Sequence, residues 1–319
     1  MEFKINSLAK FIGYSMDERI RYKSSSGGIG TGILKYLFEI GYIETAVSLV
    51  YDAELCKYRP EFIYCFEDFN NCGSVYHEIE LIEYIKENYS KVKGRLSVFC
   101  MGCQVNYIRK ILQRHNIESF ILSLVCSGQT EIKGIYTYYR LLGIKKEDIF
   151  SIQFRGNGWP SGIQIKLKNG NFLKRNNWTE PWSTLHTSHL YQPRKCFFCK
   201  ESFNKAADVS LADPWLDKYI NIDTVGNTIF CVNTNIGIEI ITAMINKRLI
   251  YVTEAFDSDF LKSQHSIYMQ RLINPKSHRS MAKIANLCGN IYYRNIMSSC
   301  MFTLKIHNNI VLKLMNKRK

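Results

Sequence analysis

The sequence has little proline, no long hydrophobic run and too few acidic residues to balance its basic ones. Its 319 residues include only 6 prolines, which excludes a proline-rich linker protein. No apolar stretch reaches the roughly 18 residues that a membrane-spanning helix needs. The first twenty residues carry acidic side chains where a signal peptide would be uniformly apolar. These absences predict a soluble, cytoplasmic protein without a transmembrane segment.

The shortage of acidic residues predicts an anionic partner. Lysine and arginine number 42 against 28 aspartates and glutamates, so the net charge is +14. A surplus of this size is typical of contact with nucleic acid, a membrane surface, a phosphorylated cofactor or an acidic protein. Hydrophobic residues make up 46% of the chain, which excludes intrinsic disorder and is enough for one large domain or two ordinary ones.

Cysteine, in contrast, is abundant. The chain has 11 cysteines, an odd number, and no signal peptide is expected. A disulfide framework therefore does not fit, and the composition favours a reducing compartment with metal-binding or redox-active thiols.

Strand and helix patterns alternate through the first half of the chain. Helices are predicted at 31–40, 77–89, 105–115 and 130–142, and strands at 43–51, 61–66, 96–100 and 120–125. Alternation of elements of this length predicts an α/β fold whose core is a mixed, largely parallel sheet with flanking helices.

The pattern changes near residue 148, where α+β elements begin. A strand is predicted at 149–155, and two further strand-like runs at 163–168 and 172–175 flank Asn169-Gly170, which predicts a β-hairpin. Together these elements form an insertion over about 148–176. A cysteine-bearing loop region follows over about 182–215, and a strand at 228–232 and a helix at 236–247 complete the core. We therefore divide the chain into an N-terminal segment 1–22, a core 23–250, and a C-terminal helical region 251–319 with a basic tail.

The strongest local motif is a Cys-x-x-Cys pair at Cys196 and Cys199. Two thiolates at this spacing on a turn can converge on one metal ion or one iron–sulfur cluster. The alternative is a pair of buried core cysteines. A thioredoxin-type dithiol fits less well, because the motif follows a loop and not a strand.

A second such pair, Cys100 and Cys103, ends a predicted strand, and Cys126 ends the next. In a parallel sheet the carboxyl ends of strands meet at one edge, so these thiols are expected near the loop that carries Cys196 and Cys199. Five candidates thus compete for four positions. Spacing alone does not choose between zinc and an iron–sulfur cluster.

A polar loop opens the first predicted helix of the core. Its five residues provide backbone N–H groups at a helix N-terminus, where an anion is favoured. They are Ser24, Ser25, Ser26, Gly27 and Gly28. The loop is either a phosphate-binding site or a simple helix cap.

Five stretches occur in a fixed order along the chain and carry a resemblance. They are Arg21 to Gly28 (RYKSSSGG), Gly73 to Tyr76 (GSVY), Cys100 to Gln104 (CMGCQ), Arg194 to Cys199 (RKCFFC) followed by Ala207 to Trp215 (ADVSLADPW), and Gly226 to Thr234 (GNTIFCVNT). They resemble the R-x-x-SSGG, GSKY, GxPCQ, RPxCxxC with ADISxGDxW, and G-x-S-x-x-x-x-N-T motifs of the coenzyme F-420 hydrogenase and dehydrogenase beta-subunit family, which includes 7-hydroxymethyl chlorophyll a reductase.

The resemblance implies two cofactors, FAD and one 4Fe-4S cluster. The cluster would be held by the cysteines that fall on family cysteines: Cys103, Cys126, Cys196 and Cys199. Cys100 occupies a position that is usually glycine in the family. The Ser24 to Gly28 loop would bind the flavin pyrophosphate, and Arg155 resembles the arginine of the family's F-R-x-K segment. Asp208 and Asp213 either cap turns and strand ends or place polar groups beside the cluster loop.

The sequence also departs from the family pattern. Val75 replaces a lysine, Gly102 a proline and Ala212 a glycine, and the frequent N-terminal ferredoxin module is absent. These departures leave the substrate open: a deazaflavin coenzyme, NAD(P)H, or a small metabolite of polysaccharide or sugar-nucleotide metabolism.

The resulting prediction is an oxidoreductase or electron-transfer subunit that exchanges hydride at a flavin and single electrons through a cluster. No residue is assigned as a catalytic acid or base. A basic collar, consisting of Arg194, Lys195, Lys200 and Lys205, suits an acidic ferredoxin or other one-electron carrier. The alternatives are a zinc-stabilised four-cysteine binding module and a basic nucleic-acid-binding protein, although no RNP or zinc-finger motif supports the latter. The sequence is compatible with assembly of the chain into a homo-oligomer.

Overall fold

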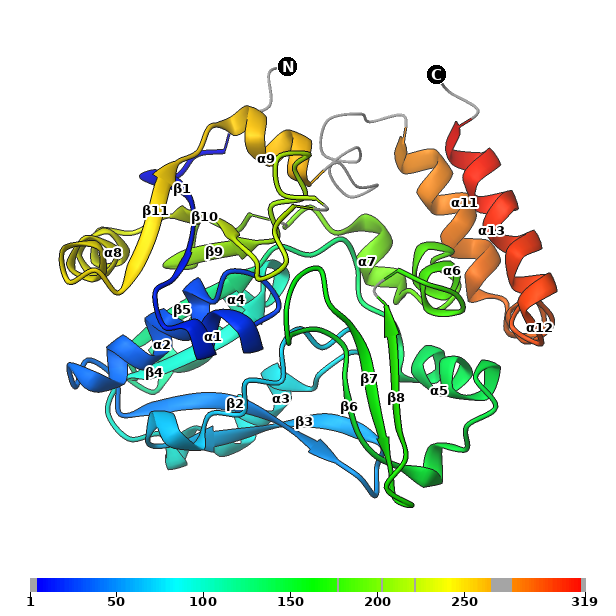
Figure 1. The fold of residues 1–319 in the computed structure, drawn as a ribbon, viewed down its shortest axis with the longest axis horizontal. Helices are drawn as coiled ribbons and strands as arrows, with labels where there is room; N and C mark the ends of the chain where they lie inside the picture. The colour runs from blue at the N-terminus through cyan, green and yellow to red at the C-terminus, as the bar shows by residue number, and fades with distance from the viewer. Residues whose placement is uncertain (1–4, 177, 202, 221, 265–276, 317–319) are drawn as a thin grey trace.

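A computed structural model describes residues 5–176, 178–201, 203–220, 222–264 and 277–316 of the chain. An eight-stranded sheet crosses the molecule in the order β11-β1-β10-β9-β5-β4-β2-β3 (Figure 1). Its strands are β1 (Ala9–Ser15), β2 (Thr45–Asp52), β3 (Lys57–Ile63), β4 (Leu96–Met101), β5 (Ser119–Leu124), β9 (Val209–Ala212), β10 (Thr228–Val232) and β11 (Ile250–Glu254).

The predicted α/β class is confirmed, and the sheet is mixed. The four central strands β9, β5, β4 and β2 run parallel to one another. The strands outside them pair antiparallel, with β10, β1 and β11 at one edge and β3 at the other. The carboxyl ends of β4 and β5 therefore meet at one edge of the sheet, as the sequence predicted for parallel neighbours.

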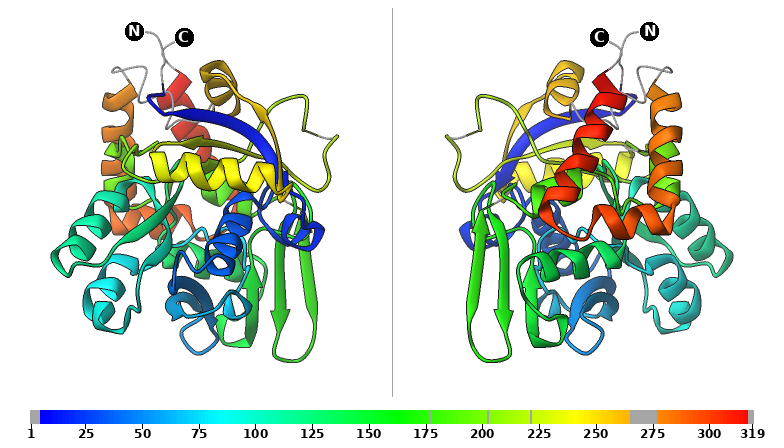
Figure 2. Two further views of the ribbon diagram at one scale, coloured as in Figure 1. Left: turned by 90° about the vertical axis from the view of Figure 1, so that its left-hand side faces the viewer. Right: turned by 90° about the vertical axis from the view of Figure 1, so that its right-hand side faces the viewer.

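Helices cover both faces of this sheet (Figures 1 and 2). On one face α2 (Ile29–Glu39) and α8 (Asn235–Asn246) pack on Phe120 and Leu122 of β5. On the other, α3 (Leu81–Asn88) and α4 (Gly102–Arg114) pack on Ile121. Because successive strand residues point to opposite faces, a strand covered on both faces, such as β5, buries consecutive residues, here Phe120 to Ser123.

A second layer contains the insertion and the C-terminal helices. Strands β6 (Ile149–Gln153), β7 (Gly162–Leu167) and β8 (Phe172–Asn176) form an antiparallel sheet, and the Asn169-Gly170 hairpin is confirmed by Gly170 at φ +88°. One apolar cluster joins this sheet to five helices. They are α5 (Ile132–Leu141), α6 (Trp182–Thr187), α7 (Arg194–Phe198), α11 (Ser277–Gly289) and α13 (Met301–Asn316).

The remaining elements are short. They are α1 (Glu18–Lys23), α9 (Asp257–Ser263), α12 (Ile291–Met297) and the 3₁₀ turns η1 (Phe66–Asp68), η2 (Tyr89–Lys91) and η3 (Lys146–Asp148). None of the helices described here has both the length and the apolar composition to cross a membrane. The predicted basic tail lies partly outside the described residues.

Three strands, β1, β9 and β11, were absent from the sequence-based prediction. Segment 1–22 was predicted to lie outside the core, yet its strand β1 pairs between β10 and β11 of the main sheet. A glycine interrupts β1: a Cβ on Gly13 would lie 2.0 Å from the carbonyl oxygen of Tyr251, so only glycine allows this close approach. β9 lies within the predicted loop region and has only four residues, so it is identified as a strand by its pairing with β5 and β10.

Two predicted boundaries were wrong. The strand expected at 61–66 is β3 at Lys57–Ile63, and the helix expected from residue 77 begins at Leu81. His77 lies instead in an isolated bridge to Thr130, and its buried Nε2 accepts a hydrogen bond from the Tyr58 N–H at 3.0 Å. This contact holds 77–80 outside the helix, although the apolar periodicity continues through it.

Candidate functional site

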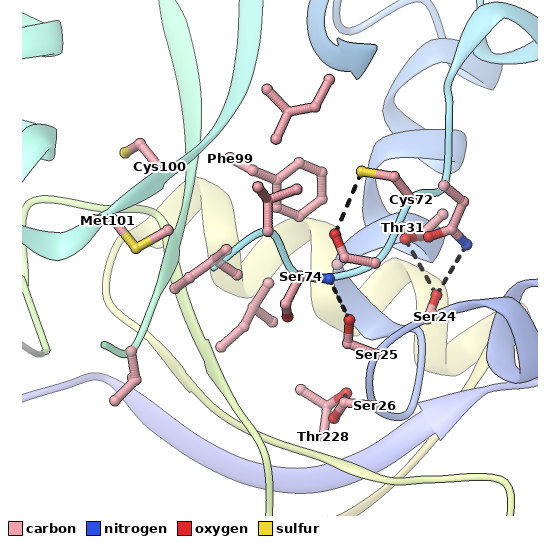
Figure 3. A pocket seen from close by; sticks show the side chains of 18 of the residues that line it. Ser24, Ser25, Ser26, Thr31, Cys72, Ser74, Phe99, Cys100, Met101 and Thr228 are labelled. Carbon is pink, nitrogen blue, oxygen red and sulfur yellow. Dashed lines mark hydrogen bonds between the residues drawn. The ribbon is translucent and has the colours of Figure 1, made fainter. Parts of the chain in front are cut away.

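A cavity of about 220 Å³ opens where the N-terminus of α2 faces the carboxyl ends of β4, β5 and β9 (Figure 3). One wall is the predicted serine–glycine loop, and a second is the segment 69–75. The floor is apolar, with Val47, Leu49, Phe99, Leu124 and Leu211 among its residues. An apolar hollow with a few polar groups at one end is the ordinary form of a cofactor or substrate site.

The serine–glycine loop is held in shape by its own side chains. Ser25 Oγ accepts a hydrogen bond from Ser74 N–H at 2.5 Å, and Ser26 Oγ donates to the carbonyl oxygen of Asn227 at 2.5 Å. The Gly27 N–H donates to Thr228 Oγ1 at 2.9 Å. Three of the sequence motifs therefore meet at this loop, although Ser74 lies 49 residues from Ser25 in the chain and Asn227 lies 201 residues from Ser26.

The loop leaves the start of α2 open to the cavity. Gly28 is the N-cap residue in the left-handed conformation, at φ +77°, and no side chain caps the helix. The first turn carries no acidic residue. N–H groups at an uncapped helix N-terminus favour an anion, so the predicted phosphate-binding loop has suitable geometry for one.

Arg155 reaches the loop from the second sheet. Its Nη2 donates to the carbonyl oxygen of Ser25 at 2.6 Å, and its two Nη groups contact the Asp213 carboxylate at 3.0 and 3.1 Å. Burial alone would lower the pKa of this guanidinium, but Asp213 and the Tyr76 hydroxyl raise it above its ordinary value, so Arg155 stays charged. The predicted positive charge is present, and Asp213 neutralises it.

The four cysteines predicted as cluster ligands interact with one another. Cys103 lies in the first turn of α4, Cys126 follows β5, Cys196 lies in α7, and Cys199 ends α7. A hydrogen bond with Cys199 raises the pKa of the Cys103 thiol, as do burial and the nearby thiols of Cys199, Cys126 and Cys196. The thiol of Cys103 therefore lies near the other three thiols, which come from two further segments of the chain. In the described part of the chain, no set of three or more His, Cys, Asp or Glu side chains is arranged to hold a metal ion.

Backbone N–H groups point at two of these sulfurs. The Gly128 N–H donates to Cys126 Sγ at 3.3 Å, and the Gln129 N–H donates to the sulfur of Cys196. Burial raises the pKa of the Cys196 thiol, and the hydrogen bond from Gln129 lowers it by a smaller amount. Such donors stabilise thiolates, and hydrogen bonds to ligand sulfurs tune iron–sulfur clusters.

Cys100 has a different environment. It is 1% exposed, and its side chain belongs to the apolar cluster beneath α3 and α4. Burial raises the pKa of its thiol to about 12, which is typical of an unreactive core cysteine.

The cavity and the four-cysteine group share a wall. Met101, Gln104 and Gln129 line the cavity, and they lie beside Cys103 in the chain or in the turn that follows Cys126. A cofactor in the cavity and a cluster on the cysteines would therefore be neighbours.

The basic collar lies at the surface of the cysteine loop. Arg194, Lys195, Lys200 and Lys205 are all exposed. Lys195 Nζ lies 3.3 Å from Glu78 Oε1, so this lysine is partly neutralised. The other three have no ion pair among the residues that the structure describes.

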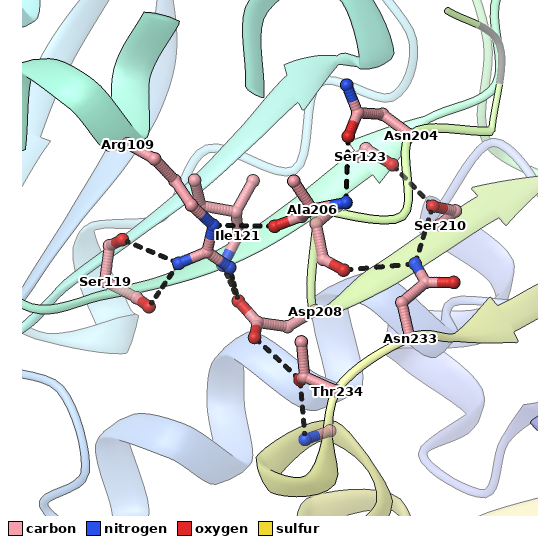
Figure 4. A network of polar contacts seen from close by, with 12 residues as sticks. Arg109, Ser119, Ile121, Ser123, Asn204, Ala206, Asp208, Ser210, Asn233 and Thr234 are labelled. Atoms are coloured by element: carbon pink, nitrogen blue, oxygen red, sulfur yellow. Dashed lines mark hydrogen bonds and ion pairs between the residues drawn. The ribbon is translucent and has the colours of Figure 1, made fainter. Parts of the chain in front are cut away.

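Asp208 stabilises the fold through hydrogen bonds whose partners were not predicted from the sequence. Its carboxylate accepts hydrogen bonds from Arg109 Nη2 at 2.7 Å, from Ile121 N–H at 2.7 Å and from the Thr234 hydroxyl at 2.8 Å (Figure 4). The side chain is buried and ties together α4, β5 and the start of α8. Tyr76 and Trp215, which contact Arg155, were also missed, although both close a recognised motif.

Comparison with known proteins agrees with the resemblance. The family model described as the C-terminus of the coenzyme F420 hydrogenase/dehydrogenase beta subunit matches residues 93–258, and the model of its N-terminal part matches residues 11–86. No curated protein matches the chain. Among solved structures, a chain of the F420-reducing [NiFe] hydrogenase complex from Methanosarcina barkeri is similar, with a TM-score of 0.60 and 15% identity over 92% of this chain and 96% of that one. The chain therefore belongs to the coenzyme F420 hydrogenase/dehydrogenase beta-subunit family and is an oxidoreductase or electron-transfer subunit.

Proposed function

We propose that the protein is an oxidoreductase or electron-transfer subunit that binds FAD in the cavity and a 4Fe-4S cluster on Cys103, Cys126, Cys196 and Cys199. The observation that carries this proposal is the meeting of four thiols from three segments beside a cavity with an uncapped helix N-terminus. When bound, the flavin would supply two-electron hydride chemistry and the cluster would supply one-electron transfer.

The cavity residues suit a flavin. The open N–H groups of α2 and the adjacent serine hydroxyls match a pyrophosphate. The apolar floor at Phe99, Leu124 and Leu211 matches a planar aromatic ring and excludes water from it. Arg155 and Asp213 hold the Ser25 carbonyl in place, so their role is to orient the loop and not to react.

The cysteine group suits a cluster. Four thiols approach one another, and backbone N–H groups already point at two of the sulfurs. Cys103 lies at the N-terminus of α4, where the helix dipole favours a thiolate.

An external carrier completes the electron path in this proposal. The exposed basic collar around the cysteine loop suits an acidic ferredoxin. The similar chain from Methanosarcina barkeri is part of a multisubunit complex, so a protein subunit is the other candidate partner. The substrate of the flavin is a deazaflavin coenzyme, NAD(P)H or a metabolite of sugar-nucleotide chemistry.

Anaerobic purification followed by metal and flavin analysis tests the proposal. We expect a coloured protein with about four irons and one FAD per chain, as four thiolates around one cluster imply. A colourless protein with stoichiometric zinc would support the zinc-stabilised module instead. Binding to nucleic acid that weakens steeply as the salt concentration rises would support the alternative of a basic nucleic-acid-binding protein.

A further inference from the structure

The positive charge of the chain is concentrated at its C-terminal end. Residues 260–319 contain 11 lysines and arginines and no aspartate or glutamate, out of a net charge of +14 for the whole chain. In the described part of this segment, α11, α12 and α13 lie side by side on one side of the molecule (Figure 2). This distribution is independent of the cavity and the cysteines.

The inner faces of these helices are part of the core. Ile284 and Cys288 of α11 and Leu304 and Val311 of α13 are buried in the cluster that also contains α5 and α6. The buried His307 ring lies 2.9 Å, through Nε2, from the carbonyl oxygen of Ser188. The layer is therefore fixed to the body of the protein, with a defined outer face.

That outer face is apolar to an unusual degree. Large hydrophobic side chains are exposed on α12 and α13, with Tyr292 at 79% and Phe302 at 73% exposure. The others are Ile291, Ile296, Ile306 and Leu312. On α13 Phe302 and Ile306 are four residues apart and so lie on one side of the helix, and the polar Asn309 is exposed about one turn farther along.

Exposed cations occur on the same group of helices. Arg279 and Lys283 are exposed one turn apart on α11, and Lys313 is exposed near the end of α13. Among the described residues no acidic side chain pairs with these three. Lys305 and Arg294 are instead paired with Glu180 and Glu131. The C-terminal surface consists of the six exposed apolar side chains of α12 and α13 together with Arg279, Lys283 and Lys313.

We propose that the C-terminal surface docks on an anionic lipid membrane. Exposed aliphatic and aromatic side chains bordered by lysine and arginine are the pattern of a surface that lies in the headgroup region, where apolar side chains enter the acyl boundary and cations remain with the phosphates. The exposed Tyr292 suits this position because its ring is amphipathic. Six exposed large apolar side chains on two helices that contact each other are typical of an interaction site.

Charge argues against the other occupants. A second copy docked through the same surface would bring two acid-free, cationic surfaces together, which is unfavourable. Nucleic acid would match the cations but would leave Ile291, Ile296 and Phe302 without apolar partners. An anionic bilayer satisfies both kinds of side chain.

Flotation of the full chain, prepared with its cofactors, tests the proposal. The probes are vesicles of phosphatidylcholine alone and vesicles that also contain phosphatidylglycerol. We expect binding to the anionic vesicles only, weakened by salt. Two double variants test the two kinds of side chain: the charge variant Lys283→Glu with Lys313→Glu, and the apolar variant Ile296→Ser with Phe302→Ser. Each should lower the affinity for the anionic vesicles by at least about tenfold.

Matched variants elsewhere control for general effects. Lys86→Glu with Lys110→Glu, and Leu55→Ser with Ile222→Ser, change exposed residues outside this surface and should bind as the unchanged protein does. Every variant should keep the flavin and cluster absorbance and the melting temperature, so failure here is distinguishable from failure of the proposed function. No binding, equal binding to neutral vesicles, or binding that neither variant weakens would overturn the proposal. So would a dimer that dissociates with Phe302→Ser, or nucleic-acid binding that the serine variant leaves unchanged.

Discussion

Arg155 and Asp213, 58 residues apart in the chain, form a two-pronged ion pair in the wall of the cavity, with N···O distances of 3.0 and 3.1 Å. Asp213 also accepts a hydrogen bond from Trp159 Nε1 at 3.1 Å. Arg155 is 2% exposed, so neither water nor salt screens the pair strongly. The pair connects the second sheet to the Ser25 carbonyl and so to the proposed flavin site.

Arg155→Met should destabilise the protein and impair flavin retention. Removing one partner of a buried pair leaves Asp213 poorly compensated, which costs about 3 kcal/mol of unfolding free energy. Urea unfolding and the FAD content of the purified protein measure both effects. Arg59→Met, at an exposed pair with Asp52, is the control and should cost less than about 1 kcal/mol. Equal costs at the two positions would contradict the prediction.

Two glycines of α2 should respond in opposite ways to alanine. A Cβ on Gly30 would lie 2.6 Å from Leu211 Cδ1 and 2.7 Å from Phe99 Cε1, both in the cavity floor. Gly30→Ala should therefore displace the floor and weaken FAD binding about tenfold. A Cβ on Gly32 meets nothing closer than 3.5 Å, so Gly32→Ala should raise the unfolding free energy by about 0.5–1 kcal/mol. Flavin titration of the apoprotein and urea unfolding distinguish the two outcomes.

Local pattern predicted most of the elements, because strands such as β4 and β5 are mainly apolar and their helices are amphipathic. The same reasoning failed where pairing partners decide the conformation. β1 contains a glycine and two polar residues, and it is a strand because β10 and β11 flank it on both sides. No local signal distinguishes such a segment from a loop.

The residues of the candidate site also fall into those that local pattern predicted and those that it did not. The serine–glycine loop and the cysteines were predicted because their residue types and spacing carry chemistry. The partners of Asp208 were not, since Arg109 lies 99 residues away in the chain and Ile121 contributes only a backbone N–H. Long-range polar pairs depend on the folded geometry, which the pattern of one sequence does not contain.

His77 should make the protein less stable in mild acid. Burial lowers the pKa of its imidazole from about 6.5 to about 4. Between these values the unfolded chain binds a proton that the folded chain does not, so stability is complete above pH 6.5, falls as pH decreases, and levels off below about 4. The loss is about 3 kcal/mol. Protonation at Nε2 would also break the hydrogen bond from Tyr58 N–H.

Comparison with His77→Gln isolates this contribution. Glutamine does not titrate and can still accept from Tyr58, so its unfolding free energy should depend less on pH in this window. Urea unfolding of both proteins from pH 4 to 8 gives the two profiles. Parallel profiles would show that His77 is not the cause. Burial also lowers the pKa of His186, to about 3, and that group contributes equally to both proteins.

The basic collar should make reduction by ferredoxin dependent on charge. Lys195→Glu with Lys200→Glu replaces two exposed cations beside the proposed cluster, and electrostatic attraction to an acidic ferredoxin should weaken. We expect the rate of flavin reduction to fall about tenfold at low salt and to converge with the unchanged protein at high salt. Stopped-flow measurements across a salt series test this, with Lys86→Glu and Lys110→Glu as the control. Rates indifferent to salt and to both variants would refute docking at the collar.

Cys103 and Cys100 should differ sharply although only two residues separate them. The Cys103 thiol forms a hydrogen bond with Cys199 and lies near the thiols of Cys126 and Cys196, whereas Cys100 is buried among apolar side chains of β4 and α4. Cys103→Ser should lose the cluster absorbance and most of the iron, because three thiolates hold a 4Fe-4S cluster poorly. Cys100→Ser should keep the iron, at a cost of about 1–3 kcal/mol for a hydroxyl in an apolar core. Iron analysis and urea unfolding of both variants, with Cys126→Ser as a second ligand variant, measure the difference. Loss of iron in Cys100→Ser with full iron in Cys126→Ser would mean that Cys100, and not Cys126, holds the cluster.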